Sequence, residues 1–403
     1  MLADGDWREQ DVLFEYFLRE VPFLTARTEA LFPNETGSLG FWQTETATKF
    51  GALTQVDYGL CGQGFSRTTE PAWLGANPYV LWDRYGDGPM SELSLMILDR
   101  YLYDGDDAAL SARLPWAFGA IDFFAMIYKN RTSSGQVVVW PTQVCETFWC
   151  PWPVGAECVT NDAPTVSTVT RLLQRLLMLP ARFSTPAQRA GWSALLAAMP
   201  PLPFNATTGL FAPAEHYVAA KSHNSESGEL YAVHPARLYS VGRNLTVPGG
   251  VDRWAAMVAS FYADPDGSPD DDGWHQGVMQ APLLGERARA GQLFAGRLGG
   301  HPVDGYRFPF FSGEDGMNAL PSIEWFSNLA SGIQFALVQP GDDDGAGEAV
   351  LLPGWPCGWN VSFALRGPKN ATVRAVFAGG AVQALDVEPP ERAASFSVAP
   401  GCA

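Results

Sequence analysis

The sequence predicts a mainly α-helical, toroid-type domain over residues 1–338, followed by a small C-terminal antiparallel β-sandwich over residues 339–403. Three observations lead to this prediction. From Asp6 to about Gln334 the apolar residues recur with helical spacing. Long loops rich in Gly, Pro and Trp separate the helical segments. After about Gln339 the pattern changes to short apolar or alternating runs between Gly, Pro and Asn, which is typical of strands.

Six segments carry an apolar stripe of the helical kind, and an Asn161-Asp162 pair gives one of them a polar start signal. Helices are therefore predicted at Met90–Tyr103, Pro115–Tyr128, Pro164–Leu179, Gln188–Met199, Arg253–Tyr262 and Gly277–Leu298. Many amphipathic helices joined alternately by short turns and long loops indicate helical hairpins arranged as a toroid. A solenoid or a four-helix bundle is the alternative, but the sequence has no repeat at a fixed period of about 30–45 residues.

The long loops and the strands complete the predicted architecture. Loops of this length are more often functional than structural, and they are expected at Trp42–Trp82, Pro141–Ala163 and Pro302–Trp325. After the turn-rich linker GDDDGAGE, five strands are expected in the runs AVLLPGW, NVSFAL, TVRAVFA, AVQALDV and ASFSVA.

Composition limits the classes of partner. A chain of 403 residues with 47% hydrophobic residues can bury a large core, and no run of about 18 apolar residues predicts a membrane span. The net charge of -17 would repel nucleic acid and anionic lipid, so a neutral substrate is expected. The 14 tryptophans favour sites for the flat apolar faces of sugar rings, although a large aromatic core would explain them equally well.

Sequons and cysteines indicate the compartment. Six of the eleven asparagines lie in N-x-[ST] triplets, where chance would put one or two: Asn34, Asn130, Asn205, Asn244, Asn360 and Asn370. Cys150 and Cys158 flank a Pro-Trp-Pro turn and are predicted to form a short disulfide, whereas the pairing of the other four cysteines stays open. We therefore expect an extracellular protein or one of a secretory or lysosome-like lumen. The opening MLADGDWREQDVLF lacks the features of a signal peptide, so the true N-terminus is expected to be missing.

One loop carries an isolated acid among aromatic residues. In WPTQVCETFWCPWPVGAEC, Glu146 is surrounded in sequence by Trp140, Phe148, Trp149 and Trp152. Apolar surroundings raise the pKa of a carboxyl group and keep it protonated near neutral pH, as a general acid requires. Glu146 is thus a catalytic candidate, and the alternative is an ordinary loop acid beside a core cluster of tryptophans.

Several segments, in order, resemble a known group of enzymes. These are GPMSELSLMILDRYLYDGDDAAL, WPTQVCETFW, ELYAVHPARL, DDGWHQGVMQAPLLGERARA and VLLPGWPCGWNVSFALRGP. Over roughly residues 35 to 400 the chain resembles the C-terminal two thirds of six-hairpin (α/α)6 glycosidases, and it is most similar to glycoside hydrolase family 95 (inverting α-L-fucosidases and α-galactosidases) and its uncharacterised relatives. The resemblance implies an (α/α)6 toroid whose first part is missing from this sequence.

The resemblance also implies site residues. Glu146 falls where the family has its general acid, and DDGWHQG, with Asp272 and Trp274, falls on the segment that includes or neighbours the general base. ELYAVHP, with His234, falls on a substrate-contacting segment. The family's histidine-rich run is replaced by HNSESGE, which places Glu226 and Glu229 where histidines would be. These departures put the sugar specificity in doubt and leave the base open.

The candidate residues are therefore Glu146 as acid and Asp272 as base, with Glu226, Glu229 and Glu324 as alternatives for the base. Asp272 stands at a helix entrance, where a helix N-terminus favours an ionised carboxylate, although acidic runs are usually solvated loops. For His234 the alternative is a structural histidine. Predicted substrate contacts are Trp42, Trp82, Trp149, Glu226, Glu229, His234, Trp274 and Glu324. The remaining histidines are too scattered for a metal site, and no nucleotide or phosphate-binding motif occurs, so neither a metal nor a cofactor is expected.

Together these observations predict a secreted, glycosylated glycoside hydrolase that cleaves a terminal α-L-fucoside-like or α-galactoside-like sugar with inversion. Such an enzyme needs one protonated carboxyl on the leaving oxygen and one carboxylate that activates water on the opposite face of the ring. One alternative is another six-hairpin enzyme such as a polysaccharide lyase, which the low content of Lys and Arg disfavours. The other is a catalytically inactive carbohydrate-binding relative.

Overall fold

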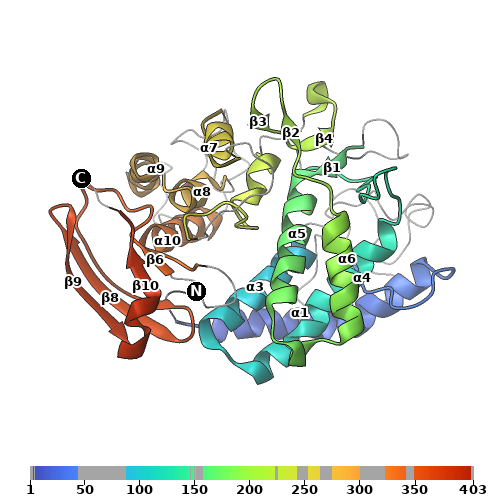
Figure 1. The fold of residues 1–403 in the computed structure, drawn as a ribbon, viewed down its shortest axis with the longest axis horizontal. Helices are drawn as coiled ribbons and strands as arrows, with labels where there is room; N and C mark the ends of the chain where they lie inside the picture. The colour runs from blue at the N-terminus through green and yellow to red at the C-terminus, as the bar shows by residue number, and fades with distance from the viewer. Residues whose placement is uncertain are drawn as a thin grey trace, which may run out of the picture. The chain divides into compact units, whose positions relative to one another are not determined.

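The computed structural model describes residues 3, 5–43, 88–145, 147–148, 150, 158–222, 226–242, 253–263, 275–299, 323–341 and 349–400 (Figure 1). The chain forms two compact units. The N-terminal unit consists of Asp6–Tyr101 and Gly105–Ala236. The C-terminal unit consists of Arg237–Ala403 together with Met1–Gly5 and Leu102–Asp104. The described part of the chain is mainly helical.

The described part of the N-terminal unit is built from helices with two short strand pairs. Its helices are α1 (Arg8–Leu31), α3 (Gly88–Asp104), α4 (Asp107–Ile127), α5 (Ala163–Met178) and α6 (Pro186–Ala198). Its strands are β1 (Thr160–Asp162), β2 (Phe204–Asn205), β3 (Leu210–Phe211) and β4 (Ala214–His216), and β1 pairs antiparallel with β4, as β2 does with β3. Helices α5 and α6 pack side by side (Figure 1). The predicted helices over residues 90–103, 164–179 and 188–199 are confirmed within one or two residues.

Helix α4 begins earlier than predicted. The apolar stripe predicts a helix that starts at Pro115, but Asp106 is the N-cap. Its carboxylate accepts the N–H groups of Ala108 and Ala109 at 2.9 and 3.0 Å. Pro115 lies inside the helix. The prediction was wrong here because a proline favours a helix start but does not require one, and the stronger capping residue lay upstream.

Helix α4 is also long and apolar enough, by length and composition, to cross a membrane. The sequence alone predicts no such segment. More than half of its apolar window is buried inside the structure, with Leu114, Trp116 and Phe124 among the buried side chains. Packing on several sides explains this composition, because a helix surrounded by other elements is apolar around its circumference.

A buried carboxylate fixes the start of α5. The Oδ1 atom of Asp162 accepts the N–H of Thr165 at 2.7 Å, and the Asp162 side chain is fully buried. Burial raises the pKa of Asp162 to about 6, and the hydrogen bonds from Thr165 oppose this rise. The cap thus stabilises the helix at the cost of burying an ionisable group.

Asp162 should therefore respond differently to two substitutions. Asp162→Ala removes the acceptor and should lower the free energy of unfolding by about 1–2 kcal/mol, whereas Asp162→Asn keeps an oxygen for Thr165. The pKa is higher in the folded than in the unfolded chain, so the wild-type protein should lose stability as the pH rises from about 4 to about 6. The Asn variant should lack this component. Urea unfolding of the three proteins across this range measures both effects, and equal losses for Ala and Asn would contradict the capping role.

The core of the N-terminal unit is aromatic. The rings of Trp42 and Phe123 stack 6.5 Å apart, and the Arg27 guanidinium lies 4.7 Å from the Trp42 ring while donating to the Trp42 carbonyl at 2.6 Å. Trp42, which the sequence analysis placed among the substrate contacts, is fully buried. It presents no surface to a ligand in this structure, and part of the tryptophan surplus belongs to the core.

The C-terminal unit contains four described helices, α7 (Arg253–Ala263), α8 (Gly277–Leu283), α9 (Arg287–Gly299) and α10 (Ile323–Leu337). The prediction of one helix over residues 277–298 was wrong, because a turn at Leu284–Gly285 divides it into α8 and α9. Gly285 has a φ of +77°, a left-handed conformation that glycine adopts readily and that ends a helix. The apolar stripe continues across the turn because both helices face α10, against which both pack.

In the described part of the C-terminal unit, six strands lie in two sheets. Strands β7 (Val361–Gly367), β8 (Ala371–Ala378) and β9 (Ala381–Glu388) form an antiparallel sheet in the order β7-β8-β9 (Figure 1). Strands β5 (Val338–Gln339), β6 (Ala349–Leu351) and β10 (Phe396–Val398) form the other in the order β10-β6-β5. All five predicted strand runs contain strands, but β10 pairs with β6 in parallel, so the expectation of a purely antiparallel pairing was wrong for this strand.

Alternation of side chains decides which face of the larger sheet is covered. Along β8 the residues Ala371, Val373, Ala375 and Phe377 are buried, and the intervening residues point the other way. The two sheets contact each other at Gly367 of β7 and Phe396 of β10. A Cβ atom added at Gly367 would lie only 2.8 Å from the Phe396 ring. The last helix ends at Leu337 and the first of these strands begins at Val338, where the sequence pattern changes. The compact C-terminal unit groups these strands with α7–α10. The domain boundary between residues 338 and 339 therefore stays a prediction.

Candidate active site

A tight turn surrounds the position of Glu146. The backbone N–H of Val144 donates to the Phe148 carbonyl at 3.0 Å, and the N–H of Phe148 donates back at 3.1 Å. Between them Cys145 has a φ of 42°, and its carbonyl accepts Gln143 Nε2 at 2.6 Å. We call the described residues Val144, Cys145, Thr147 and Phe148 the Cys145 turn. Glu146 itself lies outside the described residues, but the chain on both sides of it is placed by these hydrogen bonds.

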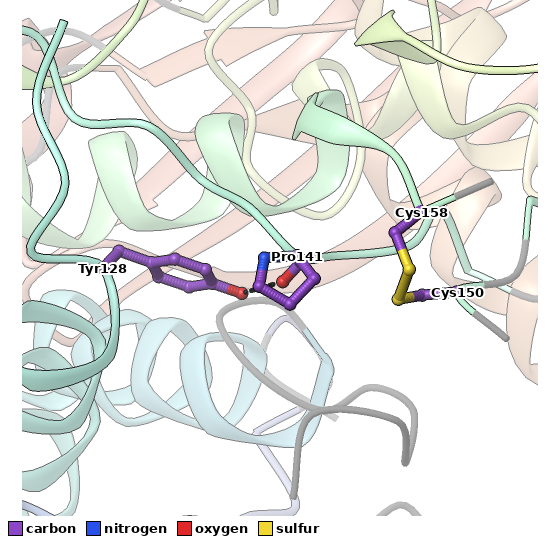
Figure 2. Close-up of a disulfide and its surroundings, with 4 residues drawn as sticks. All are labelled: Tyr128, Pro141, Cys150 and Cys158. Carbon is purple, nitrogen blue, oxygen red and sulfur yellow. Dashed lines mark hydrogen bonds between the residues drawn. A yellow bond between two sulfur atoms is a disulfide. The ribbon is translucent and has the colours of Figure 1, made fainter. Parts of the chain in front are cut away.

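The Cys145 turn is anchored at both ends. Before it, the Tyr128 hydroxyl donates to the Pro141 carbonyl at 3.1 Å (Figure 2). Thr142 also forms a β-bridge with Val159. After it, Cys150 and Cys158 form a disulfide, which confirms the predicted pairing (Figure 2). The loop that carries Glu146 is thus tied to the segment immediately before β1, the strand that leads into α5.

Two other cysteines are described. Cys145 is not part of a disulfide, and Cys357 is disulfide-bonded. The cysteines of this loop therefore differ in their bonding state.

Removing the Cys150–Cys158 disulfide should have a modest and local effect. The cross-link closes a short loop, so the chain-entropy relation gives about 2–3 kcal/mol for its loss. The double variant Cys150→Ser/Cys158→Ser should show this decrease in the free energy of unfolding in chemical denaturation. Cys145→Ser is the matched control and should leave the cross-link intact. A double variant as stable as the wild-type protein would contradict the stabilising role.

A segment distant in sequence packs on the Cys145 turn. The Thr147 hydroxyl donates to the Glu226 carbonyl at 2.8 Å, and the helix η4 (Gly228–Ala232) begins two residues later. A Cβ atom at Gly228 would overlap the Val144 side chain and would lie 3.4 Å from Pro164. Only a residue without a side chain allows η4 to approach the turn and the first residues of α5 this closely.

Four ionisable groups near this contact influence one another electrostatically: Glu92, Cys145, Glu226 and Tyr231. The Tyr231 hydroxyl is hydrogen-bonded with the Cys145 thiol. Burial, followed by the neighbouring Cys145, Glu92 and Glu226, raises the pKa of Tyr231 well above its usual value, so the phenol stays neutral. Burial and then the charge of Glu226 raise the pKa of Glu92 from 4.5 to about 7. The cluster therefore contains a carboxyl group able to hold a proton near neutral pH.

Glu92 was missed by the sequence analysis. It lies on α3, where the neighbouring Ser91 hydroxyl donates to Thr168 Oγ1 of α5 at 3.1 Å and so fixes the helix against α5. Glu92 is surrounded by protein yet keeps partial solvent exposure, unlike Ser91 and Leu93 on either side, which are buried. The available signal was an acid within the apolar run MSELSLMIL, since ionisable residues on a buried helix face are rare.

Aromatic rings border the described part of the Cys145 turn. The Phe148 ring contacts the Tyr217 ring with centroids 4.9 Å apart, and both rings keep solvent exposure. Trp140 is 40% exposed. Trp149 and Trp152 lie outside the described residues. The described rings therefore leave apolar surface open to solvent beside the turn, as a surface for sugar rings requires.

The remaining predicted site residues fall in different places. Glu229 is half-buried in η4, and His234 is half-buried just after it, with its backbone N–H donating to the Leu230 carbonyl at 3.1 Å. Glu324 lies in α10, but its side chain lies outside the described part. Also outside the described residues are Trp82, Trp149, Asp272 and Trp274. The structure thus brings Glu226 next to the Cys145 turn, with Glu229 on the helix that follows, and gives no position for the predicted base Asp272.

The sequons are accessible where they are described. Asn34, Asn130, Asn205, Asn360 and Asn370 are exposed, and Asn244 lies outside the described residues. Glycosylation and a secretory location remain predictions. Among the described residues, no group of three or more His, Cys, Asp or Glu side chains is placed to hold a metal ion.

Comparison with known proteins gives a similarity of fold alone. No protein-family profile and no curated protein sequence matches the chain. A solved structure described as "Putative kojibiose phosphorylase from human microbiome" matches with a TM-score of 0.57 at 11% sequence identity. The match covers 92% of this chain and 52% of that protein, so the chain spans about half the length of its structural neighbour. The match shows that the chain shares its fold with part of that protein.

Proposed function

We propose that this protein is a carbohydrate-active enzyme that hydrolyses the glycosidic bond of a terminal sugar with inversion, with Glu146 as the general acid. The substrates proposed are α-L-fucoside-like or α-galactoside-like glycosides, as the resemblance of the sequence motifs implies. The fold similarity to a protein described as a carbohydrate phosphorylase supports the general class. The specific sugar rests on the sequence motifs.

The observation that carries the proposal is the group of carboxyl side chains around the Cys145 turn. Cys145 and Thr147 flank Glu146 in the sequence. Cys145 is hydrogen-bonded with Tyr231, and the Thr147 hydroxyl donates a hydrogen bond to the backbone carbonyl of Glu226. The charge of Glu226 acts on Glu92. Cleavage of a glycosidic bond by inversion needs two carboxyl groups in opposite protonation states. Burial together with like-charge repulsion creates such unequal states.

Two carboxylates are proposed for the role of general base. Asp272 is proposed from its place in the motif DDGWHQG. Glu226 is the alternative that the described structure supports, because its backbone carbonyl accepts a hydrogen bond from Thr147, next to Glu146 in the chain. Glu226→Gln and Asp272→Asn separate the two, since loss of the base removes an interaction made in the transition state and should lower kcat while sugar binding persists. The variant that keeps full turnover is not the base.

Phosphorolysis is the second candidate reaction, because the structural neighbour is described as a phosphorylase. In both reactions the acid protonates the leaving oxygen. They differ in the nucleophile, which is water in one case and inorganic phosphate in the other.

The deciding experiment is a substrate screen with product analysis. The protein is incubated with nitrophenyl glycosides, led by the α-L-fucoside and the α-galactoside, with and without inorganic phosphate. Proton NMR then identifies the first-formed anomer. An inverted free sugar formed without phosphate supports the proposal, and a sugar phosphate formed only with phosphate supports the second candidate. A retained anomer excludes direct attack by water, and no cleavage of any glycoside favours an inactive carbohydrate-binding protein.

A further inference from the structure

A buried asparagine holds an exposed carboxylate on the strand pair β1–β4. Asn161 of β1 lies opposite Glu215 of β4 in the antiparallel register. Nδ2 of Asn161 donates to Oε2 of Glu215 at 2.5 Å, while Oδ1 of Asn161 accepts the backbone N–H of Val139 at 2.8 Å. Asn161 is only 4% exposed, whereas the side chain of Glu215 is 54% exposed. A buried amide therefore fixes the orientation of a carboxylate at the protein surface.

The backbone of Asn161 is suited to this arrangement. Its φ is 52°, in the left-handed region that asparagine adopts more readily than most residues. Its N–H donates to the Val139 carbonyl at 2.9 Å, so β1 is bonded to the segment around Val139 through both main chain and side chain. Rotation of the Asn161 amide would break the hydrogen bonds to Val139 and to Glu215 together. The carboxylate is thus held by a side chain that has no freedom to turn.

The held carboxylate keeps an acceptor for a ligand. Within the described part of the chain, Oε1 of Glu215 accepts no hydrogen bond, and Nε2 of His216 lies 3.7 Å from it. A carboxylate oxygen accepts hydrogen bonds only, so it suits a ligand that donates, such as a hydroxyl group. Two residues after Glu215, the phenol of Tyr217 is 38% exposed and is able both to donate and to accept.

An aromatic surface lies beside this carboxylate. The rings of Tyr217 and Phe148 have centroids 4.9 Å apart and are inclined at 54°. Phe148 packs against three buried side chains, those of Val144, Val159 and Ala214. Because Tyr217 follows Glu215 by two positions, their Cα atoms lie within about 7 Å of each other. A fixed acceptor and a supported pair of rings are therefore neighbours on one surface.

We propose that Glu215, Tyr217 and Phe148 form a binding site for one neutral sugar ring, and we call these three residues the Tyr217 site. The two rings contact the apolar face of the sugar, and Oε1 of Glu215 accepts its hydroxyl groups. Asn161 is the positioning residue that holds Glu215 for this contact. That the sugar belongs to the substrate cleaved at Glu146 rests on the proposed function, whereas sugar binding itself does not.

An organic cation is the competing ligand. A carboxylate and the faces of aromatic rings both attract positive charge, so the same three side chains would bind a quaternary ammonium ion. The sugar is favoured because the Tyr217 hydroxyl supplies a second hydrogen-bonding group, which a sugar uses and a quaternary ammonium ion does not.

Saturation-transfer NMR of the wild-type protein tests the Tyr217 site. The probes are free L-fucose, D-galactose, D-glucose and D-mannose, because a free monosaccharide has no glycosidic bond to cleave. At least one should bind saturably, and Tyr217→Ala should raise its dissociation constant about three- to tenfold. Glu215→Gln exchanges an accepting oxygen for a donor and should raise it by a similar factor. Tyr262→Ala and Glu391→Gln, at exposed positions of the C-terminal unit, are the matched controls and should leave it unchanged.

Asn161→Asp tests the positioning role. Aspartate keeps an acceptor for the N–H of Val139 but loses the donor and repels Glu215, so sugar binding should weaken about as much as in Glu215→Gln. The double variant Asn161→Asp/Glu215→Gln restores a donor and an acceptor across the strand pair with their roles exchanged. Its unfolding midpoint should return toward that of the wild-type protein while sugar binding stays weak. Binding that returns together with stability would show that Glu215 does not accept from the sugar.

Kinetics connect the Tyr217 site to the proposed function. If the protein cleaves a glycoside, Tyr217→Ala should raise KM and leave kcat nearly unchanged, because the site binds the ground state and the transition state alike. Cleavage with an unchanged KM in Tyr217→Ala keeps the proposed function and refutes the site. Sugar binding without cleavage of any glycoside keeps the site and refutes the proposed function.

Three results of the binding experiment overturn the Tyr217 site. The first is that none of the four sugars binds saturably. The second is a dissociation constant that Tyr217→Ala leaves unchanged. The third is binding of tetramethylammonium in place of the sugars, which would assign the rings and the carboxylate of Glu215 to an organic cation.

Discussion

Replacing Glu146 by Gln should lower kcat on a natural glycoside by about 10²–10⁴. The amide keeps the size of the side chain but cannot protonate the leaving oxygen. An aryl glycoside whose leaving group needs no proton should lose much less, since for that substrate the acid contributes little to the transition state. Steady-state kinetics on one substrate of each kind measures the difference between the two losses.

Two controls define the result for Glu146. Thr147→Val removes the hydroxyl that donates to the Glu226 carbonyl but leaves the acid in place, so it tests whether disturbing the turn alone reproduces the loss. Circular dichroism and the unfolding midpoint show whether each variant is folded. Equal losses on both substrates would assign a structural role to Glu146, and no loss on either would assign the proton transfer to another residue.

Gly228→Ala should lower the free energy of unfolding by about 1–3 kcal/mol and should disturb the Cys145 turn. The added methyl group would overlap Cγ1 of Val144 and press on Pro164, so η4 and the turn must move apart. The effect is one of packing, because the conformation of Gly228 is not among the left-handed ones in the structure. Urea unfolding measures the loss of stability.

Two further variants make this test specific. Gly191→Ala adds a methyl group at a helical glycine of α6 that faces open space, so it should raise stability by about 0.5–1 kcal/mol. Val144→Ala removes the atom that the new methyl group would strike, so the double variant Gly228→Ala/Val144→Ala should lose less than the sum of the single losses. Additive losses would show that the two residues do not compete for the same space.

The sequence determined much of the local structure. Helices α3, α5, α6 and α7 and the strands β6 to β10 follow from apolar periodicity and capping residues, because these features act over one or two turns of chain. The Cys150–Cys158 pair also followed from the sequence, since two cysteines so close in a chain with this many sequons have few other uses. Local patterns misplaced the start of α4 and the break between α8 and α9, where a proline and a glycine each permit more than one conformation.

The candidate site needed the tertiary structure. Nothing in the local sequence relates Thr147 to Glu226, or Glu92 to either, and a hydrogen bond between residues 79 positions apart depends on how α3, α5 and η4 pack. The same packing buried Trp42, which composition alone suggested as a ligand contact, and it paired β10 with β6 in parallel. The sequence determined which residue types are present and where each element begins. Tertiary packing decided which acid is buried near another charge. Burial and a nearby charge set the pKa of a carboxyl group, so packing also decided that Glu92 is able to hold a proton near neutral pH.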